Sequence, residues 1–285
     1  MVWCRGLIAW RCGRTKRLRL LPAKASKLVP MAVEVSVDGL GFGYPAATGV
    51  LETLTAINLN IRPGAFVSIV GANGCGKSTL LKLIAGLLVP QRGSVTLSGE
   101  PVAAMRARKQ IAWMAQAPAL LPWLTVVQNV RLALQVNPQP GSSFRDPIAM
   151  VNAVGLAEFA DAYPATLSGG MQQRAALARA LVLDAGLWLL DEPFSALDEM
   201  TREALATDLL ALWVKSSATV VWVTHQVQEA VRLSDCVYVL SARPAQVQRE
   251  IKIGLARPRD EQSAGFMALV GEVRSELGHP VRGAP

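Results

Sequence analysis

Most of the chain alternates short apolar runs rich in β-branched residues with longer stretches of helical period. The runs that predict strands are residues 33–37, 57–61, 66–70, 94–97, 111–114, 187–190, 219–224 and 236–240. Strands that alternate with helices form a largely parallel sheet covered on both faces, so this order predicts an α/β fold. Between about residues 118 and 165 the strand pattern lapses. Residues 126–136 and 147–160 predict helices there, which indicates a helical insertion.

The positive charge of the chain is concentrated at one end. Of 29 Lys and Arg residues, eight lie in residues 1–30, which contain no Asp or Glu, so residues 31–285 carry 21 basic and 21 acidic residues. The net charge of +8 is therefore no argument for nucleic-acid binding by the folded part, and we expect no nucleic-acid partner. No uncharged apolar run approaches the roughly 18 residues needed to cross a bilayer, so any membrane role is expected to be peripheral.

The cysteine spacing and the first thirty residues bear on metal binding and on the compartment in which the protein works. Cys4, Cys12, Cys75 and Cys236 form no Cys-x-x-Cys pair, which argues against zinc and for a reducing compartment. The apolar stretch within residues 1–30 is too short for a signal peptide. Two interpretations of this basic extension stay open: a disordered or wrongly assigned start, or an arm that lies on anionic lipid.

A glycine-rich segment follows the expected strand at residues 66–70. It reads Gly71-Ala-Asn-Gly-Cys-Gly-Lys-Ser-Thr79 and precedes a helical stretch at residues 80–88, the strand-to-helix setting of a P-loop. Backbone N–H groups of such a loop surround the β-phosphate, and the helix N-terminus adds its positive end. The candidate nucleotide-binding residues are Gly71, Asn73, Gly74, Cys75, Gly76, Lys77, Ser78 and Thr79. We expect Lys77 to reach the β- and γ-phosphates, Ser78 to ligate Mg²⁺, and Thr79 to lie near the α-phosphate.

An acidic pair ends the apolar run at residues 187–190. Asp191 and Glu192 would lie at the carboxyl end of a parallel strand, where such sheets bind ligands. Asp191 suits a Mg²⁺ ligand, usually through water, and Glu192 suits a general base that polarises the attacking water. A surface acidic pair is the alternative, and four preceding large apolar residues disfavour it.

The segment Leu167-Ser-Gly-Gly-Met-Gln-Gln-Arg174 resembles the signature sequence of ATP-binding cassette (ABC) ATPases. Together with the segments 191–193 (Asp-Glu-Pro) and 195–198 (Ser-Ala-Leu-Asp), it makes the chain similar to this family from about residue 33 to at least residue 240. The resemblance implies an α/β P-loop NTPase with an ABC-type RecA-like core sheet, an antiparallel β subdomain and an inserted α-helical subdomain. It also implies an ATPase that uses ATP and Mg²⁺. The expected ABC ATPase domain spans residues 31–285, with a helical insertion at about 118–165 and a short helical tail at about 241–285.

Three further residues take roles from the resemblance alone. Tyr44 is implied to stack on adenine, Gln116 to sense Mg²⁺ and link to the helical insertion, and His225 to contact the γ-phosphate. Their alternatives are a core ring, an exposed loop amide and a structural histidine at a strand end. The commonest form of the family signature ends in Gln, and this sequence has Met171 there instead, which puts any role of that amide in doubt.

The resemblance also implies that one chain is half of an enzyme. In the family, the signature of one subunit closes over ATP held in the P-loop of its partner. Ser168, Gly169 and Gly170 would complete the γ-phosphate cage in trans, and Asp198 would cross the interface. Only one P-loop and one signature occur in the sequence, so a homodimer, or a heterodimer with a similar subunit, is expected.

The stretch at residues 120–130 and the segments at 240–244 and 255–259 resemble importer ATPases for nitrate, aliphatic sulfonates and taurine. The implied function is the ATP-hydrolysing subunit of an importer for a small organic or inorganic anion. It would lie on the cytoplasmic face of the cell inner membrane against transmembrane permease subunits, and an extracytoplasmic substrate-binding protein would act indirectly. The alternatives are a thiamine-precursor importer, an exporter or lipid mover, and a soluble non-transport ABC protein.

Overall fold

The computed structural model describes residues 31–47, 49–137 and 145–278, so the basic extension at residues 1–30 lies outside the described part. The strands are β1 (Val35–Ala46), β2 (Gly49–Ile61), β3 (Phe66–Val70), β4 (Arg92–Leu97), β5 (Glu100–Pro101), β6 (Ile111–Met114), β7 (Leu187–Asp191), β8 (Thr219–Val223), β9 (Cys236–Leu240) and β10 (Val247–Lys252). The α-helices are α1 (Lys77–Ile84), α2 (Val102–Ala107), α3 (Val126–Gln135), α4 (Pro147–Ala153), α5 (Gly169–Leu181), α6 (Glu199–Ser216), α7 (Val227–Leu233) and α8 (Ala264–Gly278). Within the described ranges, no helix has the length and apolarity required to cross a membrane.

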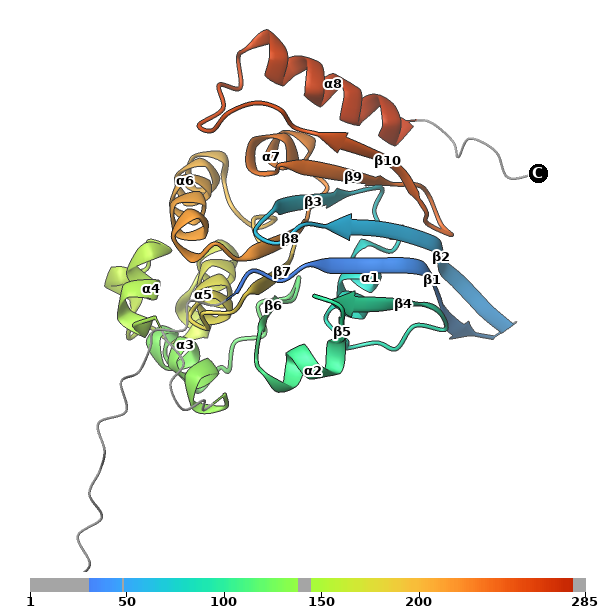
Figure 1. The fold of residues 1–285 in the computed structure, drawn as a ribbon. Coiled ribbons are helices and arrows are strands. Elements are labelled where there is room, and N and C mark those ends of the chain that lie inside the picture. The colour runs from blue at the N-terminus through green and yellow to red at the C-terminus, as the bar shows by residue number, and fades with distance from the viewer. Residues whose placement is uncertain (1–30, 48, 138–144, 279–285) are drawn as a thin grey trace, which may run out of the picture.

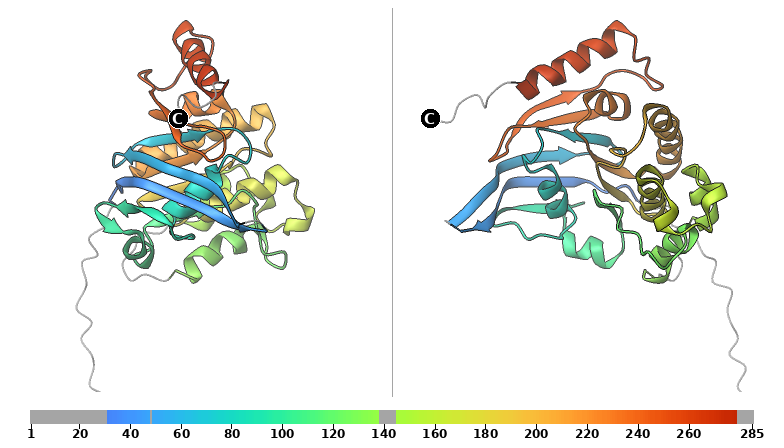
Figure 2. Two further views of the ribbon diagram at one scale, coloured as in Figure 1. Left: turned by 90° about the vertical axis from the view of Figure 1, so that its right-hand side faces the viewer. Right: turned by 180° about the vertical axis from the view of Figure 1, so that it is seen from behind.

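Two sheets form the framework (Figure 1). The larger sheet has the order β10-β9-β3-β8-β7-β6, with β9, β3, β8, β7 and β6 parallel and β10 antiparallel at one edge. The smaller sheet, β2-β1-β4-β5, is antiparallel throughout. Helices α3, α4 and α5 gather at the end of the molecule away from the smaller sheet, as the opposite views in Figures 1 and 2 both show. The parallel core, the antiparallel sheet and the helical region match the architecture expected from the sequence.

Alternate residues of the core strands face two different layers. In β7, Leu187 and Leu189 pack with the smaller sheet and α1, whereas Trp188 and Leu190 pack with α5 and α6. Successive side chains of a strand point to opposite faces, so a strand covered on both faces needs apolar residues at every position. This requirement explains why the core strands are nearly continuous apolar runs in the sequence.

The C-terminal region differs from the helical tail expected at residues 241–285. Its first element is β10, a strand that pairs with β9, and only α8 is helical among the described residues of this region. Three consecutive polar residues separate Val247 from the buried Ile251, so the segment lacks the alternation that predicts a strand.

Three other expected elements have different lengths. The helix expected over residues 147–160 ends at Ala153, because Gly155 adopts a φ of 66° and residues Ala157–Phe159 form a separate 3-10 turn. Strands β1 and β2 extend well beyond the short runs at residues 33–37 and 57–61. Register shifts within the β1–β2 pair interrupt the apolar alternation on which the shorter prediction was based.

Candidate nucleotide-binding site

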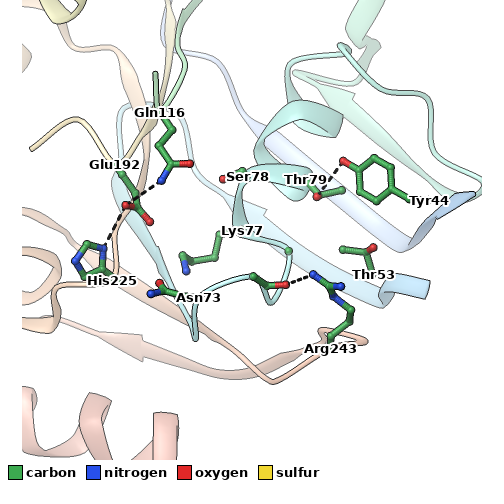
Figure 3. Close-up of a pocket in the computed structure, with 12 residues that line it drawn as sticks. Tyr44, Thr53, Asn73, Lys77, Ser78, Thr79, Gln116, Glu192, His225 and Arg243 are labelled. Carbon is green, nitrogen blue, oxygen red and sulfur yellow. Dashed lines mark hydrogen bonds and ion pairs between the residues drawn. The ribbon is translucent and has the colours of Figure 1, made fainter. Parts of the chain in front are cut away.

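A cavity of about 340 Å³ lies at the carboxyl ends of β3, β7 and β8 (Figure 3). It is lined by Tyr44, Thr53, Asn73, Gly74, Gly76, Lys77, Ser78, Thr79, Gln116, Glu192, His225 and Arg243. All of these except Thr53 and Arg243 are candidates from the sequence. Segments far apart in the chain therefore converge on one polar hollow, as ligand sites of open parallel sheets do.

The glycine-rich loop wraps closely around the Lys77 side chain. Lys77 is only 5% exposed, and its Nζ donates hydrogen bonds to the carbonyl oxygens of Gly71 at 2.8 Å and Ala72 at 3.0 Å. Gly76 has a φ of 128°, and a Cβ there would lie 2.8 Å from Leu54 Cδ2 of β2. Only glycine fits this backbone conformation and this contact, so the loop can pack against the smaller sheet.

Cys75 lies inside the same loop but does not line the cavity. It is 3% exposed, and burial raises the pKa of its thiol. A Cβ at Gly71 would lie 2.8 Å from the Cys75 sulfur, so the two residues share one small packing space. The thiol is therefore a small buried group in the structure, and burial of this kind lowers its nucleophilicity.

Ser78 and Asp191 bring two oxygen ligands together beside the cavity. Ser78 Oγ donates a hydrogen bond to Asp191 Oδ1 at 3.0 Å, and Asp191 is 2% exposed at the end of β7. Burial raises the pKa of Asp191, the negative charge of Glu192 raises it further, and the Ser78 hydrogen bond opposes both. Among the described residues, no group of three or more His, Cys, Asp or Glu side chains could hold a metal ion. A cation here would need further oxygens from phosphates and water, which is how Mg²⁺ commonly binds.

The Glu192 carboxylate is the centre of a polar cluster. Its Oε2 lies 3.3 Å from His225 Nδ1 and 3.4 Å from Gln116 Nε2, and all three side chains face the cavity (Figure 3). Glu192 adopts a φ of 48°, a left-handed conformation that costs a non-glycine residue on the order of 1–3 kcal/mol. Its backbone N–H donates to Val223 O at 2.9 Å, which helps to hold this conformation. The strained turn directs the carboxylate into the cavity.

Gln173, in α5, is a positioning residue that the sequence analysis missed. Its side chain is 2% exposed, and its Nε2 donates to the carbonyl oxygens of Gln116 at 3.3 Å and Glu192 at 3.2 Å. A buried amide thus ties together the two loops that carry the polar cluster. The only signal in the sequence was its place in the signature-like segment, because both of its partners are distant along the chain.

Tyr44 lies at the opposite end of the cavity from the Glu192 cluster. Its ring packs edge-to-face on Phe42 with a centroid separation of 5.0 Å, and 36% of the residue is exposed. The hydroxyl lies 3.3 Å from Thr79 Oγ1 in the first turn of α1. The ring is therefore anchored beside the glycine-rich loop with part of its surface open, rather than enclosed in the core.

The signature-like residues are not part of this cavity. Ser168 caps α5 by accepting a hydrogen bond from Met171 N at 3.2 Å. A Cβ at Gly170 would lie 2.9 Å from Ala196 O, so glycine is needed there, whereas a Cβ at Gly169 would meet nothing within 4 Å. The start of α5 is thus packed on one side and open on the other.

Asp198 also lies outside the cavity, at the start of α6. Its carboxylate accepts hydrogen bonds from Thr201 N at 2.9 Å and Thr201 Oγ1 at 2.8 Å, and these bonds lower the pKa of Asp198. Within one chain, this carboxylate therefore acts as a helix cap. The structure leaves Ser168, Gly169, Gly170 and Asp198 without a role in the cavity of their own chain.

Comparison with known proteins gives a consistent result. The family described as ABC transporter matches residues 54–195. An uncharacterized ABC transporter ATP-binding protein of Methanocaldococcus jannaschii is 44% identical over 239 residues, which cover 83% of this chain and 88% of that protein. The aliphatic sulfonates import ATP-binding protein SsuB of Bacillus thuringiensis is 37% identical over 246 residues (86% and 96%). The nitrate import ATP-binding protein NrtD of Synechocystis is 42% identical over 232 residues (81% and 86%).

One solved structure resembles the greater part of this chain. It is a dimeric ATP-binding cassette in a post-hydrolysis state bound to ADP and Pi, with a TM-score of 0.69 and 32% identity. The match covers 78% of this chain and all of that chain. The α/β fold expected from the sequence is confirmed by this likeness.

Proposed function

The chain belongs to the ABC transporter family and is an ATPase, and from that membership we propose that it drives an importer of a small anion such as a sulfonate, taurine or nitrate. The relatives named for the import of aliphatic sulfonates and nitrate, at 37% and 42% identity, support this cargo class. In this proposal the chain lies peripherally on the cytoplasmic face of the cell inner membrane. It contacts transmembrane permease subunits, and an extracytoplasmic binding protein delivers the cargo to them.

One observation carries the catalytic part of the proposal: the glycine-rich loop and the Glu192 cluster share one cavity. The Lys77 ammonium and the loop N–H groups would bind the β- and γ-phosphates, and the exposed part of the Tyr44 ring would stack on adenine. Glu192 would then accept a proton from the attacking water, and His225 would contact the γ-phosphate from the same side of the cavity. Gln116, within reach of Glu192, would position that water.

The oxygen ligands beside the cavity fit Mg²⁺. Ser78 Oγ and Asp191 Oδ1 are already 3.0 Å apart, and Gln116 offers an amide oxygen from the facing loop. All are hard donors of the kind that Mg²⁺ prefers. When bound, the ion would neutralise part of the phosphate charge. Asp191 and Ser78 would hold their oxygens in place for it, and the Asp191 carboxylate would stay ionised opposite the cation.

The position of the signature-like residues supports hydrolysis by a pair of chains. Ser168, Gly169 and the neighbouring amides lie outside the cavity of their own chain, at a helix start that is open on one side. Such a helix start binds anions. In the proposed dimer it would close over the γ-phosphate held by the partner, and Asp198 would cross the interface. The dimeric state of the similar solved structure supports this assembly.

Mixing two inactive variants tests the shared site. A Lys77→Ala chain lacks the cradle, and a Ser168→Ala chain lacks the closing hydroxyl, so each is expected to be nearly inactive alone. An equal mixture forms mixed dimers in half of all pairs, and each mixed dimer contains one intact site, so about a quarter of wild-type activity should return. Mixing each variant with itself is the control. A mixture as inactive as its components would contradict sites that are shared between chains.

Transport by the reconstituted complex tests the cargo class. Vesicles that carry the permease, with this chain and ATP inside and the binding protein outside, should accumulate a labelled alkanesulfonate, taurine or nitrate. Vesicles without ATP inside should accumulate none. A complex carrying Glu192→Gln is the matched control and should accumulate none. Uptake of a thiamine precursor, with no uptake of any of the three anions, would contradict the proposed cargo.

A further inference from the structure

Arg243 lines the nucleotide cavity from a segment outside all the sequence motifs. It lies in the turn between β9 and β10, and its guanidinium donates a hydrogen bond to the carbonyl oxygen of Gly74 in the glycine-rich loop (Figure 3). A turn near the C-terminal end of the core sheet thus delivers a permanent positive charge to the phosphate-binding loop. None of the roles described above uses it.

The backbone of this turn is fixed to the smaller sheet. Ala245 is completely buried, its N–H donates to Thr53 O at 2.9 Å, and its carbonyl accepts from Thr55 N at 3.0 Å. The turn is also closed on itself, because Ser241 N donates to Gln246 O at 3.0 Å. Arg243 is only two residues from the buried anchor, so its backbone position is set before any ligand binds. Such preorganisation reduces the entropy lost on binding.

The guanidinium retains the capacity to bind another partner. Arginine has five N–H donors, and an anion or carbonyl can accept from several of them at once. Across the part of the chain that the structure describes, no carboxylate forms an ion pair with Arg243. The charge at this edge of the cavity is therefore uncompensated by the protein, which favours an anionic ligand.

The position of Arg243 indicates which part of the nucleotide it faces. In Figure 3, Arg243 lies with Thr53 and Tyr44 on one side of Lys77, and Glu192 and His225 lie on the other. The polar cluster of Glu192 belongs to the end where the terminal phosphate is cleaved, and Tyr44 belongs to the base end. An anionic group on the Tyr44 side is one that ATP and ADP have in common.

We propose that Arg243 binds the α- and β-phosphates of the nucleotide and thereby sets the affinity for both ATP and ADP. This inference rests on the proposed function, because it requires a nucleotide in the cavity. An interaction that is equal in the ground state and the transition state lowers KM and leaves kcat unchanged. Arg243 is thus an affinity residue for nucleoside di- and triphosphates, distinct in effect from Glu192.

The test compares three variants of the full chain. Arg243→Gln removes the charge, Arg243→Lys keeps the charge without the planar set of donors, and Arg249→Gln removes a charge from an exposed position of β10 outside the cavity lining. Titration calorimetry would measure the dissociation constants of ADP and of a non-hydrolysable ATP analogue, and steady-state assays would give kcat and KM. Thermal unfolding would establish that each variant is folded.

We expect Arg243→Gln to weaken binding of both nucleotides by about tenfold. The variant loses a charge-assisted hydrogen bond, and the solvent exposure of the site limits the binding free energy that this bond contributes. Its kcat should stay within about twofold of wild type, because only ground-state binding changes. Arg243→Lys should be intermediate and Arg249→Gln unchanged. Added salt should weaken ADP binding to the wild type more steeply than to Arg243→Gln, a difference that a purely structural role of Arg243 would not produce.

Unchanged affinity in Arg243→Gln, a loss confined to the ATP analogue, or identical salt dependence would each overturn the inference. If Arg243→Gln does not fold, the affinity of Arg243→Lys decides the question, because lysine keeps the charge and loses the planar set of donors: weaker binding of both nucleotides supports the inference, and unchanged affinity overturns it. Failure of the wild-type chain to bind either nucleotide would instead overturn the proposed function. The two failures are therefore distinguishable in one set of titrations.

Discussion

Replacing Glu192 by Gln tests the proposed proton-accepting step of hydrolysis. The variant keeps the shape of the side chain, and its amide oxygen can still accept the hydrogen bond that Gln116 Nε2 makes at 3.4 Å. It also keeps the backbone conformation, because the bonds to Val223 O and from Gln173 Nε2 involve the main chain of residue 192. What it loses is the carboxylate that, in the proposed mechanism, takes a proton from water.

The size of the effect follows from the isolation of this carboxylate in the cavity. General-base catalysis contributes about 100- to 10,000-fold to a rate, or roughly 3–5 kcal/mol of activation free energy. The side chain of Glu192 is 12% exposed, and the neighbouring Asp191 hydrogen-bonds to Ser78. Among the described residues, Glu192 supplies the only carboxylate of the cavity lining, so no other one is placed to replace the proposed base. We therefore expect kcat to fall by at least about 1,000-fold with ATP affinity within about threefold of wild type.

Single-turnover and steady-state phosphate release would measure kcat, and titration with ATP would measure affinity. Size-exclusion chromatography with ATP and Mg²⁺ should show a stable dimer of the variant, because bound nucleotide is no longer consumed. Glu272→Gln, a change at an exposed position of α8, controls for loss of a carboxylate elsewhere. Normal hydrolysis by Glu192→Gln would refute its role as the base, and loss of nucleotide binding would show that the carboxylate serves to hold the loop instead.

Three further predictions follow from buried polar groups. Lys77→Ala should weaken ATP binding by at least about 100-fold, since a charged hydrogen-bond donor is lost beneath the phosphates; equal dissociation constants in titration calorimetry would contradict the cradle. Gln173→Ala should reduce the free energy of unfolding in urea by about 1–3 kcal/mol and also reduce kcat, because two loop carbonyls lose their donor; a change in stability with normal kcat would limit Gln173 to a structural role. Burial raises the pKa of Glu229 above its ordinary value of 4.5, so folding favours its protonated form and stability should fall as the pH rises above that value. Urea unfolding from pH 4 to pH 8 should show this decline in the wild type and a weaker one in Glu229→Gln, and parallel curves would contradict it.

The sequence predicts the core sheet and the local motifs well because both are contiguous. A strand buried on both faces is nearly continuous in apolar residues, as in the first four positions of β7, and a phosphate-binding loop keeps its residues within nine positions. Their convergence also follows, since the carboxyl ends of parallel strands share one edge of the sheet. The ABC ATPase family expected from these motifs is the family that the comparisons show.

The residues that the sequence analysis missed act across long separations. Gln173 reaches Gln116 and Glu192, and Arg243 reaches Gly74, which is 169 positions away. Each of these contacts depends on how helix α5 or the β9–β10 turn packs, and packing is not visible in a local pattern. The strand β10 was missed for the same reason, because its pairing with β9 rather than its own composition makes it a strand.

The strained backbone of Glu192 and the packing of α5 belong to one connected unit. Gln173 lies one turn into the helix that begins beside Ser168, and its buried amide holds the carbonyl of Glu192 while Glu192 N–H bonds to β8. A left-handed conformation in a non-glycine residue persists only where several such contacts determine it. The backbone conformation that directs the Glu192 carboxylate into the cavity therefore depends on α5 staying packed against the core. Any displacement of α5 must either break the Gln173 hydrogen bonds or move Glu192, so the helix proposed to close over a partner's nucleotide is coupled to the proposed base of its own chain.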